Sequence, residues 1–273
     1  MCIRDRRDDA CVRRLVAPDV TPTDAIDRYI MGKIALVCTS AREMRGHPTG
    51  AWLEEIATPY YAIRDAGLDC AIVSIDGGEV PIDGASASGD FFTEDCKRFT
   101  ADAEAQGAMK GSASVHSARA DDFAGAYLAG GHGACVDFYR NAALTAFIEA
   151  FVASGKPVAA DCHGPIALLD VKRANGTPLL EGANATCFTD SEERAVGLAD
   201  KVPCLLESEF KKLGAKFSAA PDWTPNAVTD GKLVTGQNPA SSKAVSYTHL
   251  RAHETKANRR CRRLLEKKSG GGG

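Results

Sequence analysis

Short apolar segments of strand length alternate with longer helical segments through the middle of this 273-residue chain. The expected strands are Lys33–Cys38, Cys70–Ile75, Gly125–Ala129 and Pro157–Asp161, followed by a hairpin over Val228–Val234. The expected helices cover 51–66 (broken or kinked at Pro59), 91–107, 142–154, 191–202 and 205–213, and one more begins directly after Cys162. This alternation predicts an α/β fold, a mostly parallel sheet with helices on both faces. Ligands bind such sheets at the carboxyl ends of the strands, so candidate residues are sought there.

Composition and charge exclude several classes of protein. A hydrophobic share of 44% and a charged share of 25% are ordinary for a globular chain and unlike disordered, collagen-like or coiled-coil sequences. No apolar run reaches the ~18 residues of a membrane span, so no membrane partner is expected. Residues 31–245 hold 28 acidic against 19 basic residues, and this acidic body argues against nucleic acid as a partner.

The ten cysteines indicate buried free thiols rather than a disulfide framework or a metal site. No two of them are spaced as Cys-x-x-Cys, and several lie in apolar strand-like runs. Free thiols are typical of a reducing compartment, and the basic N-terminus lacks the apolar core of a secretory signal. We therefore expect a cytoplasmic protein.

The two ends do not resemble the body of the chain. Residues 1–30 show no amphipathic pattern, and we interpret them as a non-native or disordered extension before a natural start at Met31. Residues 246–273 form a basic, low-complexity tail, interpreted as non-native as well. Both contain stretches that resemble translated sequencing adapters. The expected domain is therefore 31–245.

The sharpest local signal is the run Val158-Ala-Ala-Asp-Cys-His-Gly-Pro165, where a buried strand enters a helix with almost no loop. Gly164 permits the tight turn, and Pro165 suits the first helical turn. This is the pattern of a nucleophile elbow with Cys162 at the corner, although the hydrolase motif Gly-x-Ser-x-Gly is absent. Ionising a thiol of pKa ~8.5 at neutral pH needs about 3–4 kcal/mol, of which a helix dipole supplies at best ~2. Hydrogen bonds or a nearby cation must supply the rest, and Asp161 is expected to point away from the sulfur to the opposite face of the strand.

Two further segments follow strands and would meet this elbow. Gly130-Gly-His-Gly133 comes directly after a strand, and its backbone N–H groups suit an oxyanion pocket, though a plain tight turn has the same pattern. Glu54 and Glu55 begin the helix after the first strand, about 100° apart, so at most one of them faces the site. A protonated carboxyl beside a cysteine can donate to the sulfur and then shuttle a proton. A carboxylate that only stabilises the helix start is the alternative.

These residues together resemble the ThiJ/PfpI superfamily, also described as class I glutamine amidotransferase-like, and most of all its glyoxalase III, chaperone-like branch. The segments that carry the resemblance are Thr49-Gly50 with Glu55 and Pro59, Gly130–Gly133 with Asp137, Ala160–Pro165, Pro178–Gly182, Phe188–Glu193 and Thr229–Pro239.

The resemblance implies a flavodoxin-like, three-layer sandwich with Cys162 as nucleophile. His163 would complete a Cys-His-Glu arrangement with Glu193, and Glu55 would be the carboxyl beside the sulfur. Gly131 and His132, with the backbone of His163, would form the oxyanion and substrate-binding pocket. Cys135 departs from the expected motif and is taken as a packed thiol.

The implied reaction converts methylglyoxal, a small 2-oxoaldehyde, to lactate without glutathione, cofactor or metal, and a homodimer and a stress-related role are implied too. His47, His116 and His132 show no ligand spacing, which is why no metal is expected. Two alternatives stay open, namely a deglycase, amidase or amidotransferase-like hydrolase that uses the same cysteine, and a non-enzymatic holdase or redox sensor.

Overall fold

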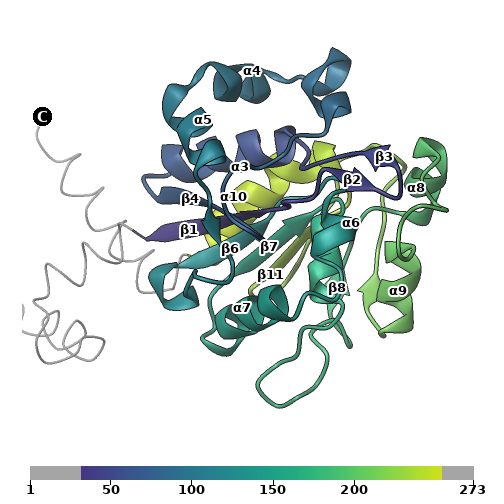
Figure 1. The fold of residues 1–273 in the computed structure, drawn as a ribbon. Coiled ribbons are helices and arrows are strands. Elements are labelled where there is room, and N and C mark those ends of the chain that lie inside the picture. The colour runs from purple at the N-terminus through teal and green to yellow at the C-terminus, as the bar shows by residue number, and fades with distance from the viewer. Residues whose placement is uncertain (1–31, 254–273) are drawn as a thin grey trace, which may run out of the picture.

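The computed structural model describes residues 32–253, which form a central seven-stranded sheet covered by helices on both faces (Figure 1). The strand order is β10-β11-β7-β6-β1-β4-β5. The strands are β1 (Lys33–Cys38), β4 (Asp69–Ser74), β5 (Ala113–Ser114), β6 (Gly125–Leu128), β7 (Val158–Asp161), β10 (Ala227–Asp230) and β11 (Leu233–Gly236). Every pairing in this sheet is parallel except that of β10 with β11. The inner order β4-β1-β6-β7-β11 is that of the flavodoxin-like doubly wound sheets, and the expected fold class is confirmed.

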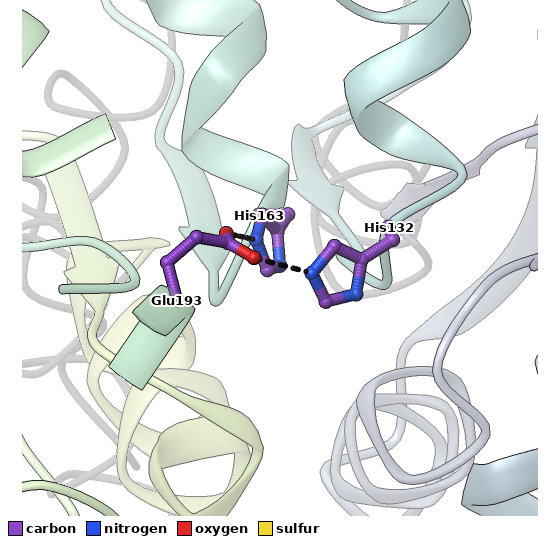
Figure 2. A group of neighbouring side chains, drawn as sticks. All are labelled: His132, His163 and Glu193. Carbon is purple, nitrogen blue, oxygen red and sulfur yellow. Dashed lines mark hydrogen bonds and ion pairs between the residues drawn. The ribbon is translucent and has the colours of Figure 1, made fainter. Parts of the chain in front are cut away.

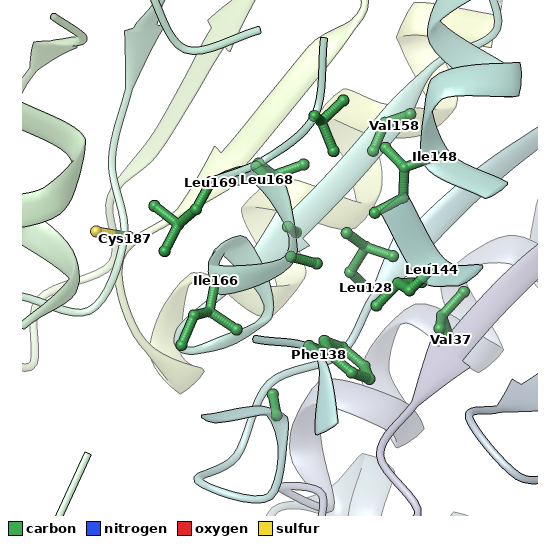
Figure 3. Packing of buried hydrophobic residues seen from close by; sticks show 14 of the residues in the cluster. Val37, Leu128, Phe138, Leu144, Ile148, Val158, Ile166, Leu168, Leu169 and Cys187 are labelled. Atoms are coloured by element: carbon green, nitrogen blue, oxygen red, sulfur yellow. The ribbon is translucent and has the colours of Figure 1, made fainter. Parts of the chain in front are cut away.

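Alternating side chains of the central strands pack into two separate apolar cores. On one face, α3 (Glu54–Asp65), α4 (Glu94–Ala101), α5 (Ala103–Lys110) and α10 (Ser242–His253) cover the sheet. On the other face lie α6 (Ala134–Asp137) and α7 (Ala142–Ala153), and Figure 3 shows part of the core there, in which Leu144 and Ile148 of α7 pack near Leu128 and Val158 of the sheet. Leu36 of β1 belongs to the first core, while its neighbour Val37 belongs to the second. Burial on both faces explains why the strands are apolar without interruption.

The remaining elements lie outside the main sheet. They are α8 (Asp190–Val196), α9 (Leu206–Lys212), the antiparallel pair β2 (Glu43–Met44) and β3 (His47–Pro48), and the parallel pair β8 (Asn184–Ala185) and β9 (Lys216–Phe217). Among the described residues, no helix is long and apolar enough to cross a membrane.

Three predicted helices differ from the observed ones. Helix α3 continues through Pro59, where we expected a break or a kink, and it is not broken there because the buried residues on either side of Pro59 pack on the sheet and outweigh the loss of one main-chain hydrogen bond. The helix expected over 91–107 is divided into α4 and α5, since the side chain of Asp102 caps the second by accepting from Glu104 and Ala105. Helix α8 ends before Gly197, whose left-handed φ of 74° terminates it six residues earlier than expected.

The last helix crosses the predicted domain boundary at residue 245. Val245, Ser246 and His249 of α10 are all buried against the α3 side of the sheet. Residues of α10 beyond 245 thus pack on the body of the fold. The predicted division of the chain into a non-native or disordered extension 1–30, a domain 31–245 and a non-native tail 246–273 stays a prediction. The expected extension 1–30 lies outside the described residues.

Candidate active site

Cys162 stands at a strained corner between β7 and the short 3-10 helix Gly164–Leu168. Its φ of 53° lies in the left-handed region, which costs a non-glycine residue of order 1–3 kcal/mol. Two backbone hydrogen bonds hold the corner, from Cys162 N to the Gly236 carbonyl at 3.1 Å and from Phe188 N to the Cys162 carbonyl at 3.0 Å. A Cβ on Gly164 would collide with the Leu128 carbonyl, so only glycine fits there. This is the geometry of a nucleophile elbow.

The Cys162 side chain is only 3% exposed and is surrounded by polar groups. Its Sγ lies 3.3 Å from Nδ1 of His163, and it contacts the backbone N–H of Gly131 and the carboxyl of Glu55. The sulfur is therefore buried yet has a hydrogen-bond donor and two possible proton acceptors beside it.

Two histidines share the carboxylate of Glu193 (Figure 2). Nε2 of His163 lies 2.7 Å from one oxygen of Glu193, and Nε2 of His132 lies 3.0 Å from the other. Each Nε2 therefore carries a proton that it donates, which leaves Nδ1 of His163 as an acceptor facing the sulfur. Burial alone would raise the pKa of Glu193, but His163 and the hydrogen bonds from both histidines hold it well below its usual value. Burial, followed by the nearby His132, lowers the pKa of His163, so this ring is neutral at physiological pH.

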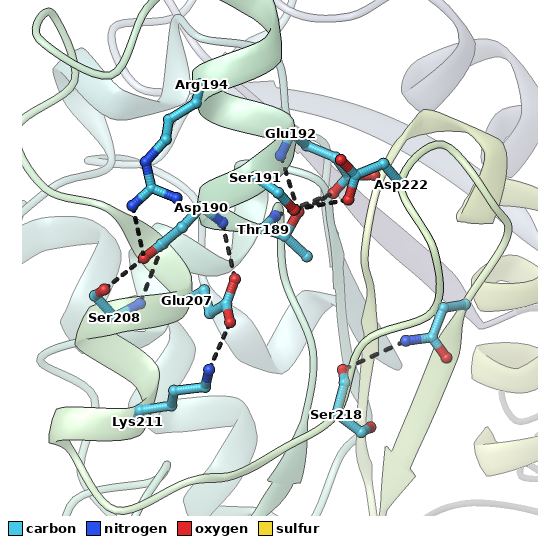
Figure 4. Close-up of polar contacts among 11 residues, drawn as sticks. Thr189, Asp190, Ser191, Glu192, Arg194, Glu207, Ser208, Lys211, Ser218 and Asp222 are labelled. Atoms are coloured by element: carbon cyan, nitrogen blue, oxygen red, sulfur yellow. Dashed lines mark hydrogen bonds and ion pairs between the residues drawn. The ribbon is translucent and has the colours of Figure 1, made fainter.

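The first turns of two helices place the carboxyl groups of the site. Thr189 caps α8 by accepting from Glu192 N at 3.1 Å, and its own N–H donates to the Glu192 carboxylate at 3.0 Å. Glu192 is also bound by Asn238 Nδ2 at 2.8 Å, which ties the start of α8 to the segment after β11. Around the same turn, Asp190, Ser191, Glu207 and Ser208 form the polar network of Figure 4. Glu193, one residue further along α8, is thereby fixed in place.

Glu55, in the first turn of α3, is fully buried, and its Oε2 accepts from the backbone N–H of Gly130 at 2.7 Å. Burial raises the pKa of Glu55 well above its usual value, and the charge of Asp161 raises it further. Glu55 is consequently protonated at neutral pH. Glu54 is only half-buried, and the sulfur contacts Glu55 and not Glu54, so of the two adjacent glutamates it is Glu55 that faces the sulfur.

The electrostatics of the sulfur differ from what we expected. Burial raises the pKa of the Cys162 thiol well above its usual value, and the Glu55 and Asp161 carboxyls add to the shift, while the Gly131 N–H opposes it. The resting sulfur is therefore a thiol and not the thiolate we expected, because removal from water outweighs the hydrogen bonds that favour ionisation.

The structure brings the predicted site residues together. Cys162 contacts His163, Glu55 and Gly131, and His163 in turn contacts Glu193. The His132 ring contacts Glu193, and its centroid lies 4.0 Å from that of the His163 ring; its expected part in the oxyanion and substrate-binding pocket stays a prediction.

Several residues around the site escaped the sequence reasoning. Phe188 packs its ring 4.4 Å from that of His163, and Trp223 lies 5.8 Å from Phe188. Asp161 points to the opposite face of the strand from the sulfur, as predicted, yet the carboxyl of Glu55 from α3 contacts both Asp161 and the sulfur. Aromatic residues in irregular segments carry no periodic signal, and a contact between α3 and β7 cannot be inferred from spacing.

Of the described residues, His132, His163 and Glu193 have potential ligand atoms that all lie within 4.8 Å of one another. Such a grouping has the composition of a site for a divalent ion. Both Nε2 atoms already donate protons to Glu193, however, so the three side chains form a hydrogen-bonded unit as they stand. The expectation of a metal-free site came from the sequence spacing of histidines, which could not reveal this cluster.

Comparison with known proteins assigns this arrangement to a family. The sequence profile of the DJ-1/PfpI family matches residues 49–251, a range that includes every predicted site residue. The chain belongs to the DJ-1/PfpI family. The resemblance seen in the sequence motifs is thereby confirmed.

Curated relatives in this family are named as glyoxalases. The chain is 32% identical over 232 residues to the glutathione-independent glyoxalase HSP31 of Saccharomyces cerevisiae, an alignment that covers 81% of this chain and 97% of the relative. It is 27% identical to glyoxalase 3 of Candida albicans, with 82% and 99% covered.

Solved structures of similar proteins share the fold over nearly their whole length. The Rapid Encystment Protein of Francisella tularensis is 34% identical, with a TM-score of 0.78 over 82% of this chain and all of the other. The structure of glyoxalase III from Candida albicans is 26% identical, with a TM-score of 0.75 over 83% and 98% of the two chains.

Proposed function

We propose that this protein is a glutathione-independent glyoxalase that converts methylglyoxal to lactate with Cys162 as nucleophile. The observation that carries the proposal is the position of Sγ between two proton-handling groups, the protonated carboxyl of Glu55 and the Nδ1 acceptor of His163. The names of the curated relatives support it.

The first step is addition of the Cys162 sulfur to the aldehyde carbon. As the S–C bond forms, the thiol gives up its proton to an acceptor beside it, either Nδ1 of His163 or the carboxyl pair of Glu55 and Asp161. The electron pair of the C=O bond moves to oxygen, and Glu55 gives a proton to that oxygen, which leaves a neutral hemithioacetal. The Gly131 N–H, which contacts the sulfur, is placed to donate to the same developing charge. Glu55 has now become a carboxylate beside the C–H bond that must break.

The second step is an internal oxidation and reduction that needs no cofactor. Glu55 takes the proton from C1, the C–H electrons form a C1=C2 double bond, and the hydroxyl proton on C1 passes to the oxygen of C2. Glu55 then returns its proton to C2, and the enediol becomes a thioester of lactate. One carboxyl that serves in turn as acid and base therefore moves the hydrogen from one carbon to the next.

Hydrolysis of the thioester completes the reaction. A water molecule attacks the carbonyl carbon while Nδ1 of His163 accepts its proton, and the Nε2–H···Glu193 hydrogen bond of 2.7 Å stabilises the imidazolium that forms. The C–S bond breaks, lactate leaves and the sulfur regains a proton.

The decisive experiment measures lactate formed from methylglyoxal without glutathione. Cys162→Ala should reduce the rate to background, and Glu55→Gln should lower kcat by about 10²–10⁴-fold because a general acid–base is lost. Cys96→Ala removes another buried thiol, on α4, whose sulfur is bound to Thr93 and Phe91 and to none of the site residues named above, and it should retain the wild-type rate. Equal rates for wild type and Cys162→Ala would reject the proposal, while ammonia released from glutamine would favour the amidotransferase alternative.

The expected location and partners belong to this proposal as well. The cysteines among the described residues are all free, which supports a cytoplasmic location. The partner proposed is a small 2-oxoaldehyde substrate, with no nucleic acid or membrane, and the homodimer stays a prediction.

A further inference from the structure

A second buried carboxyl lies behind Glu55, and the mechanism above leaves open whether the thiol proton reaches it. Asp161, the last residue of β7, is fully buried between the sheet and α10. Its Oδ2 accepts from Tyr127 Oη at 2.7 Å and from Ser242 Oγ at 2.7 Å. Its side chain also lies against the carboxyl of Glu55, which in turn contacts the sulfur of Cys162. The three groups form a chain from thiol to Glu55 to Asp161.

The two carboxyls must hold a proton between them. Oε1 of Glu55 and Oδ1 of Asp161 are both buried, and neither is bound by any other nitrogen or oxygen donor of the described residues. Two ionised carboxylates in such contact would repel each other without water to screen them, so one shared proton satisfies both oxygens. The donors on the far side, Tyr127 and Ser242, favour the ionised form of Asp161, which places the resting proton on Glu55.

We propose that Asp161 is the final acceptor of the Cys162 thiol proton, which reaches it through Glu55. The S–H bond breaks as an O–H bond forms on one oxygen of Glu55. At the same time the O–H bond on Oε1 of Glu55 breaks and one forms on Oδ1 of Asp161. The result is a thiolate beside a still-protonated Glu55, with Asp161 neutral. No proton enters or leaves the site, and departure of the sulfur from the thioester reverses the transfer.

This relay explains how a buried thiol with a raised pKa can still form a thiolate. A thiolate next to an ionised carboxylate is unfavourable away from water, whereas a thiolate that accepts a hydrogen bond from a neutral Glu55 is stabilised. The relay keeps Glu55 protonated, as the first chemical step requires. Burial raises the pKa of Asp161 to about 7 even though hydrogen bonds from Ser242, Tyr127 and Glu55 lower it, so this carboxyl can gain and lose a proton near neutral pH.

The surroundings of Asp161 contain few other titratable groups. Glu54 and Glu55 face it from α3, Tyr127 from β6, and Cys162 follows it on the chain. His249 of α10 packs its ring 6.1 Å from that of Tyr127, and β11 presents Gly236, next to the Asp161 Cβ. The other proton acceptor near the sulfur is Nδ1 of His163. Transfer of the thiol proton to His163 is therefore the rival pathway.

The test measures the reactivity of the thiol itself, so it gives an answer whether or not the protein forms lactate. Alkylation of Cys162 by iodoacetamide is followed from pH 6 to 10 by mass spectrometry of its peptide, in the full-length protein. In Asp161→Asn the amide is almost the same size but accepts no proton, so alkylation at pH 7 should slow at least tenfold and the profile should move to higher pH. Asp137→Asn removes a carboxyl that is bound to Thr39 and Ser40 and does not contact Glu55, and it should keep the wild-type profile.

A second variant separates the relay from a packing role. Ser242→Ala removes one donor to Asp161 and makes its carboxyl a stronger proton acceptor, so the profile should move to lower pH by a few tenths of a unit. Packing damage would slow alkylation in both variants. An unchanged profile in Asp161→Asn assigns the proton to His163 and overturns the proposal, as does slower alkylation in Ser242→Ala. If Asp161→Asn does not fold, as judged by thermal unfolding, the direction of the Ser242→Ala shift decides alone.

Discussion

Replacing Gly130 by alanine tests how closely the site is packed around the Glu55 carboxyl. A Cβ at this position would lie 2.7 Å from both the His163 nitrogen and the Asp161 carbonyl oxygen, and closer still to Oε2 of Glu55. The two backbone atoms belong to the elbow and cannot retreat, so the Glu55 side chain must move. It then loses its 2.7 Å hydrogen bond from Gly130 N and its contact with the sulfur.

The expected magnitude follows from these contacts. Overpacking a core position costs about 1–3 kcal/mol of stability. A displacement of about 1 Å in a catalytic group lowers the rate by roughly 10²-fold, equivalent to about 2.7 kcal/mol in the barrier. Gly130→Ala should thus remain folded while kcat/KM for methylglyoxal falls about 100-fold.

Lactate formation and urea unfolding are measured on the same preparations. Gly107→Ala is the matched control, since Gly107 is exposed in α5 and a Cβ there meets no atom within 4 Å. It should raise stability by about 0.4–1 kcal/mol and leave kcat/KM unchanged. If Gly130→Ala keeps more than a third of the wild-type kcat/KM, then either Glu55 is not required at its observed position or the loop yields, and the reasoning from packing is wrong.

Two further predictions concern the histidine–carboxylate unit and its support. The free energy of unfolding should fall as pH drops below about 6.5, because the unfolded chain protonates histidine there while buried His163, with its lowered pKa, does not. It should fall more steeply below about 4.3, where the unfolded chain protonates Glu193 and the folded protein, whose Glu193 has a lowered pKa, does not. Urea titrations between about pH 2.5 and 8 measure both slopes, and a Glu193→Gln variant with the same acid slope would show that this carboxylate is not responsible. Thr189→Ala should lower the free energy of unfolding by about 1 kcal/mol because the side-chain cap of α8 is lost, and Thr189→Ser should restore most of that stability. Urea unfolding measures both variants, and equal stability of the two would mean that the cap contributes nothing.

The sequence predicted the strands better than the details of the site. Runs such as Lys33–Cys38 and Val158–Asp161 are buried on both faces, so their composition alone marks them as inner strands. Of the break or kink expected at Pro59, the break is contradicted, because packing of the α3 face outweighs a single lost main-chain hydrogen bond. The boundary between α4 and α5 depends on the Asp102 cap, a local signal that was missed.

Contacts between distant segments account for what could not be predicted. The elbow at Cys162 is encoded locally by Gly164 and Pro165, so its position was predictable. The shared proton of Glu55 and Asp161 depends on the packing of α3 and α10 against β7, and the protonated state of the sulfur depends on its burial. Neither property is visible in the spacing of residues along the chain.

The residues around the site differ in how much substitution their packing allows. On the Gly130–Gly131 side, any larger residue collides with the main chain, so natural variation and laboratory mutagenesis are both confined there. On the other side, Phe188 lies against His163, and Trp223, 45% exposed, lies against Phe188. Phe188 and Trp223 are therefore the positions beside the site where a change of side-chain size meets the least resistance from the main chain.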